Sequence, residues 1–136
     1  MTSFVADTSA IIAVLNDEPD ALLFKREFHK ADSVLVSFAT LFEANCVVAG
    51  DRFPDGGNRL EALIELLDMT PVAFDDIQLR QARAAYTLYG RGSAHRAGLN
   101  MGDCFSYALA KSRNLPLLFK GDDFVHTDIK PALKPA

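Results

Sequence analysis

Short apolar runs alternate with longer amphipathic segments along this chain, which is the pattern expected of buried strands that alternate with helices. The apolar runs predict strands at residues 4–6, 34–36, 72–74 and 117–119, with a short fifth strand near 125–129. The amphipathic segments predict helices at 8–15, 20–30, 38–49, 59–67, 75–89 and 100–113. This alternation predicts an α/β fold, a three-layer sandwich in which helices flank a central, mainly parallel sheet of four to five strands.

Length and composition narrow the class of protein. A chain of 136 residues, 49% of them hydrophobic, is long enough for a single domain (1–136) with a substantial core. No apolar run approaches the roughly 20 residues of a membrane span, and the first residues lack the basic start of a secretory signal. We therefore expect a cytoplasmic protein without a membrane partner. Cys46 and Cys104 lie in predicted helices among apolar neighbours, so we expect both to be reduced and buried.

The helix predicted at 38–49 carries an unusual carboxylate. Apolar residues occupy nearly every face of this helix, so we expect it to be buried, and Glu43 is its only charged group. A buried carboxylate is unfavourable unless it is paired, protonated or bound to a metal ion. The alternative to a metal site is a buried ion pair between Glu43 and an arginine.

Four further aspartates fall where the elements of a parallel sheet converge. Asp7 ends the first strand, Asp103 opens the last helix, and Asp122 and Asp123 follow the fourth strand. Each has a purely structural alternative. Asp7 is a favoured helix N-cap, Asp103 could complete a capping box, and the last two could be solvated turn residues.

The joint pattern of these carboxylates favours a site for a divalent cation. Residues that follow parallel strands and residues on adjacent helices can meet at one edge of the sheet, where open α/β sheets bind ligands. Carboxylate oxygens select Mg²⁺ or Mn²⁺ over zinc. A water molecule bound to such an ion can become a nucleophile while the ion stabilises charge on a phosphate.

The net charge of −4 does not exclude a phosphodiester substrate. A conventional nucleic-acid-binding protein is basic, whereas this chain has 18 acidic and 14 basic residues. If the five carboxylates gather around cations, 13 acidic residues remain against 14 basic ones on the rest of the molecule.

Four blocks of the sequence resemble a PIN-domain ribonuclease, specifically a VapC toxin of a type II toxin–antitoxin pair. Residues 7–10 read Asp-Thr-Ser-Ala, and Glu43 closes the block 37–43. The third block spans 99–110 and contains Asp103, and the fourth spans 117–124 and contains Asp122 and Asp123. The blocks keep the family's order and cover essentially the whole chain.

The resemblance implies a parallel sheet between helices and Mg²⁺-dependent endonuclease activity on RNA, with Mn²⁺ as an alternative ion. It also implies a homodimer that a cognate VapB antitoxin neutralises, in a heterotetramer or a larger assembly.

Carried over by position, the resemblance assigns the catalytic and metal-binding roles to acidic residues: Asp7, Glu43, Asp103 and Asp122. Asp123 is a further expected metal ligand and the alternative to Asp122 as the fourth member of the set. Thr8 and Ser9 are expected to support the site by hydrogen bonding.

Residues 90–96 form a small basic loop just before the helix of Asp103. Arg91, His95 and Arg96 could reach phosphates from this loop, so we expect them to bind RNA. The alternative is an ordinary solvated connector. His95 could also act as a general base, but a metal-bound water makes such a base unnecessary.

Two other functions fit parts of the pattern. A phosphatase of the haloacid dehalogenase type also has an Asp after its first strand, but it needs a second Asp two residues later, where this chain has Ser9. A catalytically silent PIN-like module would bind RNA or a partner without cleaving RNA, and it would not need every carboxylate. The complete set of acids favours the endoribonuclease.

Overall fold

Four parallel strands form the sheet of this chain, in a computed structural model that describes residues 2–134. In chain order they are β1 (Ser3–Ala6), β2 (Ser33–Ser37), β3 (Met69–Val72) and β4 (Leu117–Leu118). Their order across the sheet is β3-β2-β1-β4, so the chain adds two strands on one side of β1 and then returns to its other side. Parallel sheets bind ligands at such a reversal, beyond the carboxyl ends of the strands.

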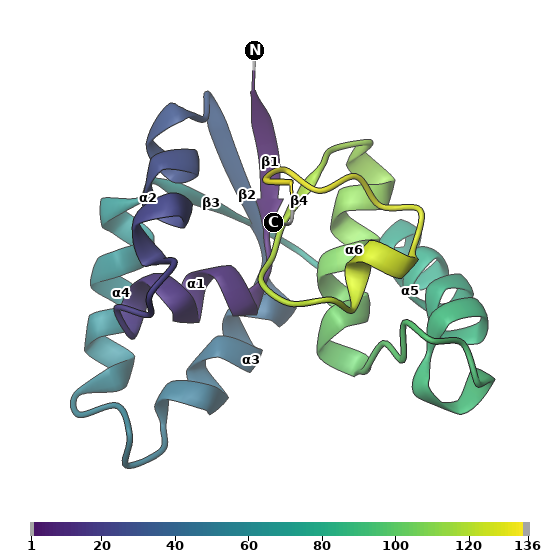
Figure 1. The fold of residues 1–136 in the computed structure, drawn as a ribbon, viewed down its shortest axis with the longest axis horizontal. Helices are drawn as coiled ribbons and strands as arrows, with labels where there is room; N and C mark the ends of the chain where they lie inside the picture. Colours follow the sequence, from purple (N-terminus) through teal and green to yellow (C-terminus); the bar gives the residue numbers. More distant parts are fainter. Residues whose placement is uncertain (1, 135–136) are drawn as a thin grey trace.

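Helices cover both sides of this sheet (Figure 1). One side carries α1 (Thr8–Leu15), α2 (Ala21–Lys30) and α4 (Gly56–Leu66), and the other carries α5 (Asp76–Tyr89) and α6 (Met101–Arg113). The helix α3 (Phe38–Val48) contacts both α1 and α6. The described residues also form two short 3₁₀ helices, η1 (Arg91–Ser93) and η2 (Phe124–His126). None of the helices within 2–134 combines the length and the apolarity needed to cross a membrane.

The core has two halves because successive side chains of a strand point to opposite faces of a sheet. Phe4 and Ala6 of β1 pack with the buried residues of α1, α2, α3 and α4. Val5, between them, packs with the buried residues of α5 and α6. The predicted α/β class and the flanking helix layers are therefore confirmed.

The third strand lies upstream of the predicted residues 72–74, and that prediction is wrong at its boundaries. Asp68 adopts a left-handed conformation (φ 53°) after α4, and the extended chain begins at once with Met69. Pro71 lacks a backbone N–H but is tolerated because β3 is an edge strand with β2 as its neighbour.

The fifth strand predicted near 125–129 is absent from the described chain, where η2 takes its place. Phe124 is buried and packs on Phe119 with ring centroids 5.1 Å apart, while the hydroxyl of Thr127 donates to the Phe124 carbonyl (2.8 Å). These contacts favour a tight turn over an extended segment. A single bridge between Leu117 and Pro131 is the only pairing that this part of the chain makes with β4.

Helix α4 starts at Gly56, inside the region predicted to be a loop before Arg59. A side chain at position 56 would overlap the backbone of Val48 in α3. Glycine therefore allows α3 and α4 to pack closely, a role that its low helix propensity hides in the sequence.

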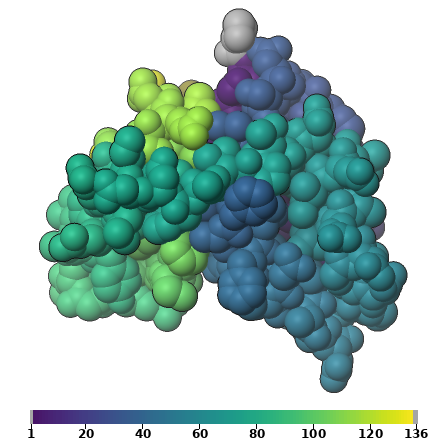
Figure 2. Space-filling model, turned by 180° about the vertical axis from the view of Figure 1, so that it is seen from behind, coloured from purple at the N-terminus to yellow at the C-terminus, as the bar shows by residue number. Residues whose placement is uncertain are grey.

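Helix α3 is not buried on every face, contrary to the prediction. Its core-facing residues are Thr40, Ala44 and Val48, whereas Phe38 and Phe42 are 56% and 71% exposed. In the space-filling view from behind, blue atoms of this region lie at the surface between the teal atoms of α4 and α5 (Figure 2). The prediction of two buried cysteines holds for Cys104 and is wrong for Cys46, which is exposed on α3.

Candidate active site

Several acidic residues lie near the carboxyl ends of the strands, where α3 packs against α1 and α6. Asp7 directly follows β1 and caps α1, Glu43 lies in the second turn of α3, and Asp103 lies in the first turn of α6. Asp122 and Asp123 form the turn between β4 and η2.

The Asp7 carboxylate is buried and accepts hydrogen bonds from Ser9 and Ser106. Its Oδ1 accepts from the Ser106 hydroxyl (2.5 Å), and its Oδ2 accepts from the Ser9 hydroxyl (2.6 Å) and the Ser9 backbone N–H (3.1 Å). Burial raises the pKa of Asp7, and these hydrogen bonds oppose that rise. The side chain is thus both the N-cap of α1 and a member of the acidic group, so the two interpretations are compatible.

Glu43 is half-buried, and its Oε1 accepts from the Thr8 hydroxyl at 2.5 Å. Burial raises its pKa, and the negative charge of Asp7 raises it further. Glu43 forms no ion pair with a lysine or arginine of the described residues, so the alternative of a buried arginine pair is wrong there.

Gly102 lets Glu43 approach α6, a role that the sequence analysis missed. A Cβ at position 102 would overlap the Glu43 carboxylate, which lies against the first turn of α6. The residue next along the chain is Asp103. The absence of a side chain at 102 therefore brings two acidic residues from different helices together.

Asp103 completes the capping box that its spacing from Asn100 allows. The side chain of Asn100 accepts from the Asp103 backbone N–H (2.8 Å), and Asp103 Oδ2 accepts from the Asn100 backbone N–H (3.0 Å). Burial raises the pKa of Asp103 to about 7, and the negative charges of Asp7, Asp123 and Glu43 contribute to the rise. A helix cap alone does not account for this crowding of carboxylates.

Asp122 and Asp123, in the turn between β4 and η2, have different surroundings. Gly121 precedes them in a left-handed conformation (φ 98°) that favours glycine, and both aspartates are exposed. The charge of Asp123 acts on Asp103. Asp122 lines a surface hollow of about 400 Å³ beside Leu23 and Phe24 of α2.

Two buried hydroxyls behind the carboxylates were also missed. The Ser106 hydroxyl, besides its bond to Asp7, lies 3.3 Å from the hydroxyl of Thr40 on α3, and both residues are fully buried. Ser106 is three residues after Asp103 and so shares its helix face. A hydroxyl at that spacing is a signal that could have pointed to Ser106.

The donor set fits a divalent cation. Asp7, Glu43, Asp103 and Asp123 offer carboxylate oxygens, the ligands that Mg²⁺ prefers, and the described part of the chain places no lysine or arginine in an ion pair with them. Within 2–134, no three acidic, histidine or cysteine side chains are already arranged as a metal site. Side-chain adjustment would therefore have to accompany ion binding.

The basic loop is closed at its base beside α6. Gly90 and Leu99 form a bridge, and the His95 ring packs edge-on against Tyr89 with centroids 4.9 Å apart. His95 Nδ1 accepts from the Ala97 backbone N–H (3.0 Å), so that nitrogen is occupied. Arg91 and Arg96 are exposed, and in the described chain neither forms an ion pair with the acidic residues.

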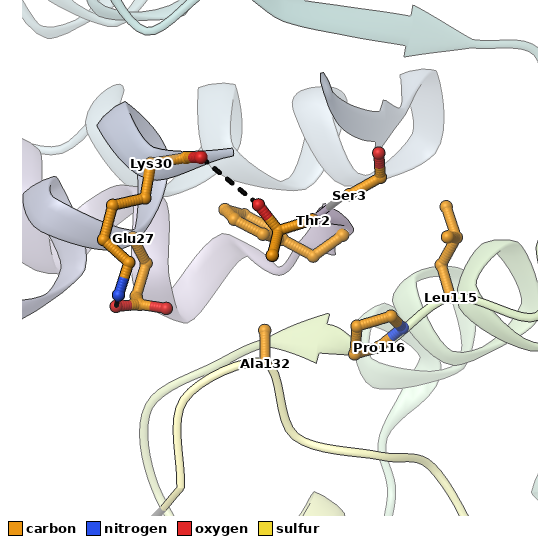
Figure 3. Close-up of a pocket in the computed structure, with 8 residues that line it drawn as sticks. Thr2, Ser3, Glu27, Lys30, Leu115, Pro116 and Ala132 are labelled. Carbon is orange, nitrogen blue, oxygen red and sulfur yellow. Dashed lines mark hydrogen bonds and ion pairs between the residues drawn. The ribbon is translucent and has the colours of Figure 1, made fainter. Parts of the chain in front are cut away.

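A hollow of about 480 Å³ lies elsewhere, beside the amino end of β1 (Figure 3). Thr2, Glu27, Lys30 and Pro116 are among its lining residues. It contains none of the predicted site residues, and Lys30 is paired with Glu27 at 3.1 Å. We therefore place the candidate site at the acidic group.

Sequence comparisons show which family the chain belongs to. The family model described as PIN domain matches residues 4–130. Ribonuclease VapC28 of Mycobacterium tuberculosis is 46% identical over 129 residues, which cover 95% of this chain and 97% of the relative. Ribonuclease VapC of Mycolicibacterium smegmatis is 45% identical over 125 residues, which cover 92% and 96%.

Solved structures share the fold. VapC20 of M. tuberculosis, described as a toxin that cleaves the sarcin–ricin loop, superposes with a TM-score of 0.73 at 15% identity, over 97% of this chain and 99% of that chain. VapBC-5 of M. tuberculosis, a member of the VapBC family of toxin–antitoxin systems, gives a TM-score of 0.65 at 27% identity, over 98% and 97%. From the matched family model and these relatives, the chain belongs to the PIN-domain family, among the VapC ribonucleases.

Proposed function

We propose that this protein is a Mg²⁺-dependent endoribonuclease, with Mn²⁺ as an alternative ion, and that it is the toxin of a toxin–antitoxin pair. The observation that supports the chemistry is the group of carboxylates from different elements. The charge of Asp7 raises the pKa of Glu43, and the charges of Asp7, Asp123 and Glu43 raise the pKa of Asp103. None of these four carboxylates forms an ion pair with a lysine or arginine among residues 2–134. The toxin role is supported by relatives that are named VapC ribonucleases.

Asp7, Glu43 and Asp103 would hold the ion, and we favour Asp123 over Asp122 as the fourth acidic residue. Asp123 acts electrostatically on Asp103, whereas Asp122 lines the hollow beside α2. When bound there, the ion would offset the clustered negative charge, activate water and stabilise charge on the scissile phosphate.

The hydroxyls around the site keep the carboxylates ready to bind. Ser9 and Ser106 donate to opposite oxygens of Asp7, and Thr8 donates to one oxygen of Glu43. A donated hydrogen bond favours the ionised form of a carboxylate, which opposes the effect of burial. Each carboxylate oxygen has two lone pairs, and Asp7 Oδ2 uses both on the hydroxyl and the backbone N–H of Ser9. The acceptor positions left for a cation are therefore on Asp7 Oδ1 and on the Glu43 carboxylate.

RNA would reach the site along the basic loop. Arg91 and Arg96 are exposed on the segment that leads into Asn100 and Asp103, so phosphates bound there would lie on the same helix end as the acidic group. Their positive charges would attract a polyanion toward an otherwise acidic centre. His95 would contribute to the shape of the loop, since its ring packs on Tyr89.

Exposed apolar residues offer surfaces for a cognate VapB-type antitoxin and for a homodimer. Phe38 and Phe42 of α3 are exposed, as are Leu22 and Leu23 of α2. Large apolar side chains that gather at the surface of a small protein are typical of interaction sites. The assembly would then be a heterotetramer or larger.

Incubation of the purified protein with total RNA tests the proposed activity. We expect internal cleavage in Mg²⁺ or Mn²⁺ and none in EDTA. A catalytically silent PIN-like module would bind RNA or its partner and leave the RNA intact in every buffer, which would refute the proposal.

A further inference from the structure

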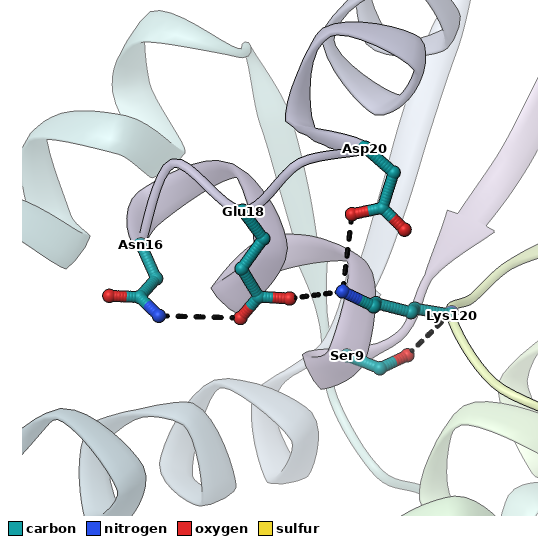
Figure 4. Close-up of polar contacts among 5 residues, drawn as sticks. All are labelled: Ser9, Asn16, Glu18, Asp20 and Lys120. Carbon is teal, nitrogen blue, oxygen red and sulfur yellow. Dashed lines mark hydrogen bonds and ion pairs between the residues drawn. The ribbon is translucent and has the colours of Figure 1, made fainter.

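The backbone of Lys120 is connected to the acidic site through a serine. Its N–H donates to the Ser9 hydroxyl (2.9 Å), and that hydroxyl donates to Asp7 Oδ2 (2.6 Å). Figure 4 shows Ser9 beside the start of the Lys120 side chain. Residue 120 therefore has a fixed position relative to Asp7.

The side chain of Lys120 is held by two carboxylates on the connection between α1 and α2 (Figure 4). Its Nζ lies 2.5 Å from Glu18 Oε1 and 3.2 Å from Asp20 Oδ1. Asn16 in turn donates to the other oxygen of Glu18 (3.4 Å). The lysine thus reaches away from Asp7 and links the end of β4 to another part of the chain.

Asp20 contacts Lys120 and does not cap the helix that follows it. It occupies the N-cap position of α2, where Asp usually accepts a backbone N–H, but its side chain caps no N–H of that helix. Its carboxylate binds Lys120 instead. The helix end therefore loses a favourable cap, and the ion pair with Lys120 is formed in its place.

The turn that carries Asp123 is short and begins at Lys120. At its far end Phe124 is buried against Phe119, and between these two anchors lie Gly121, Asp122 and Asp123. A fixed lysine at one end and a buried ring at the other restrict where the exposed Asp123 carboxylate can lie.

We infer that Lys120 is a positioning residue: through Glu18, Asp20 and Ser9 it fixes the turn that holds Asp123 near Asp103. This inference rests on the proposed metal site. The competing role for a lysine beside such a site is a direct contact with an RNA phosphate, but two carboxylates already lie within ion-pair distance of its ammonium group.

Calorimetric titration of the full chain with Mn²⁺ tests this inference. The variants are Lys120→Met and the double variant Glu18→Gln/Asp20→Asn, and Lys30→Met is the control because it breaks a comparable pair with Glu27 near the amino end of β1. We expect both test variants to bind Mn²⁺ about tenfold more weakly than wild type, the typical effect of removing a residue that orients a metal ligand. Lys30→Met should bind as wild type does.

Salt titrations of RNA binding without metal separate the two roles of the lysine. A positioning role leaves the salt dependence unchanged in Lys120→Met. A phosphate contact predicts a flatter salt dependence for Lys120→Met and stronger RNA binding by Glu18→Gln/Asp20→Asn, in which the lysine is freed.

Wild-type affinity for Mn²⁺ in Lys120→Met, or in the double variant, would overturn the inference and leave the proposed function standing. Equal Mn²⁺ binding by wild type and Asp103→Asn, or no binding by wild type, would instead overturn the metal site itself and the inference with it.

Discussion

Gly102 of α6 packs directly against the carboxylate of Glu43 on α3. The carboxylate occupies the space that a side chain at position 102 would need. The contact joins α3 to the first turn of α6, where the next residue is Asp103 of the acidic site. The spacing between the acidic residues of α3 and α6 therefore depends on a residue that has no functional group.

Gly102→Ala should displace Glu43 and weaken metal binding by about tenfold or more, the scale seen when the surroundings of a metal ligand are changed. The carboxylate is the far end of a flexible side chain, so it can move without unfolding the protein. Position 102 is helical, and alanine there recovers part of the helix propensity that glycine lacks. Mn²⁺ titration and a thermal melt measure the two effects.

Gly57→Ala is the matched control for that variant. It adds the same methyl group to helix α4, where the new Cβ meets no atom of residues 2–134 within 4 Å. We expect it to be stabilised by up to about 1 kcal/mol with unchanged Mn²⁺ affinity. Equal Mn²⁺ affinities for both variants would show that the approach of Glu43 to α6 is unimportant for the site.

Ser106→Ala removes the hydroxyl that donates to Asp7 Oδ1 from a fully buried position. We expect a loss of about 1–3 kcal/mol in the free energy of unfolding, because a buried acceptor loses its partner. The pKa of Asp7 should rise further, and Mn²⁺ binding at neutral pH should weaken. Ser112→Ala on the same helix removes a bond to the Leu109 carbonyl, away from the carboxylates, and should leave Mn²⁺ binding unchanged.

The stability of the metal-free protein should fall as pH rises from about 4 to about 7. Burial raises the pKa of Asp103 from 3.8 to about 7, so in this range the folded state holds a proton that the unfolded state has released. The contribution of this carboxyl to the free energy of unfolding is present in full below pH 3.8. It decreases as the pH rises and is gone once the pH has passed about 7. Urea unfolding in EDTA measures the slope.

Asp103→Asn isolates this carboxyl in the same experiment. The variant should be more stable than wild type at pH 7.5 and should show a weaker dependence on pH, because it cannot ionise at position 103. A wild-type protein that gains stability between pH 5 and 7.5, relative to Asp103→Asn, would contradict the electrostatic description of the site.

Replacing Arg91 and Arg96 together with alanine should weaken RNA binding and leave Mn²⁺ affinity nearly unchanged. Two lost phosphate contacts would reduce the slope of log K against log salt by about 1.4 for a single strand. Arg26, exposed in the middle of α2, and Arg113, exposed at the carboxyl end of α6, form a pair for a control double variant. If both double variants bind RNA alike at all salt concentrations, the loop is only a connector.

The α/β class could be predicted from the sequence because the spacing of apolar residues that distinguishes a strand from a helix depends only on residues that are near one another in the chain. The sequence was also sufficient for the N-cap of α1 and the capping box of α6, since Asp7 and Asn100 each accept a backbone N–H within three residues. Glu43 could be singled out as a candidate because a carboxylate in an apolar helix needs a physical reason.

The parts that the sequence could not predict depend on contacts between distant segments. Gly102 and Ser106 acquire their roles only when α6 meets α3 and β1. An apolar composition did not reveal that α3 exposes Phe42, because pattern alone cannot tell a face that packs on the core from one left outside. The choice between Asp122 and Asp123 depends likewise on the course of one turn.

The most direct test of the central claim is the rate of RNA cleavage as Mg²⁺ is titrated into EDTA-treated protein, for wild type and Asp103→Asn in parallel. We predict that wild type gains activity with Mg²⁺ and that Asp103→Asn, although folded and at least as stable, remains almost inactive at every concentration. Cleavage in EDTA, or cleavage by Asp103→Asn at the wild-type rate, would contradict a metal-dependent site built on these carboxylates.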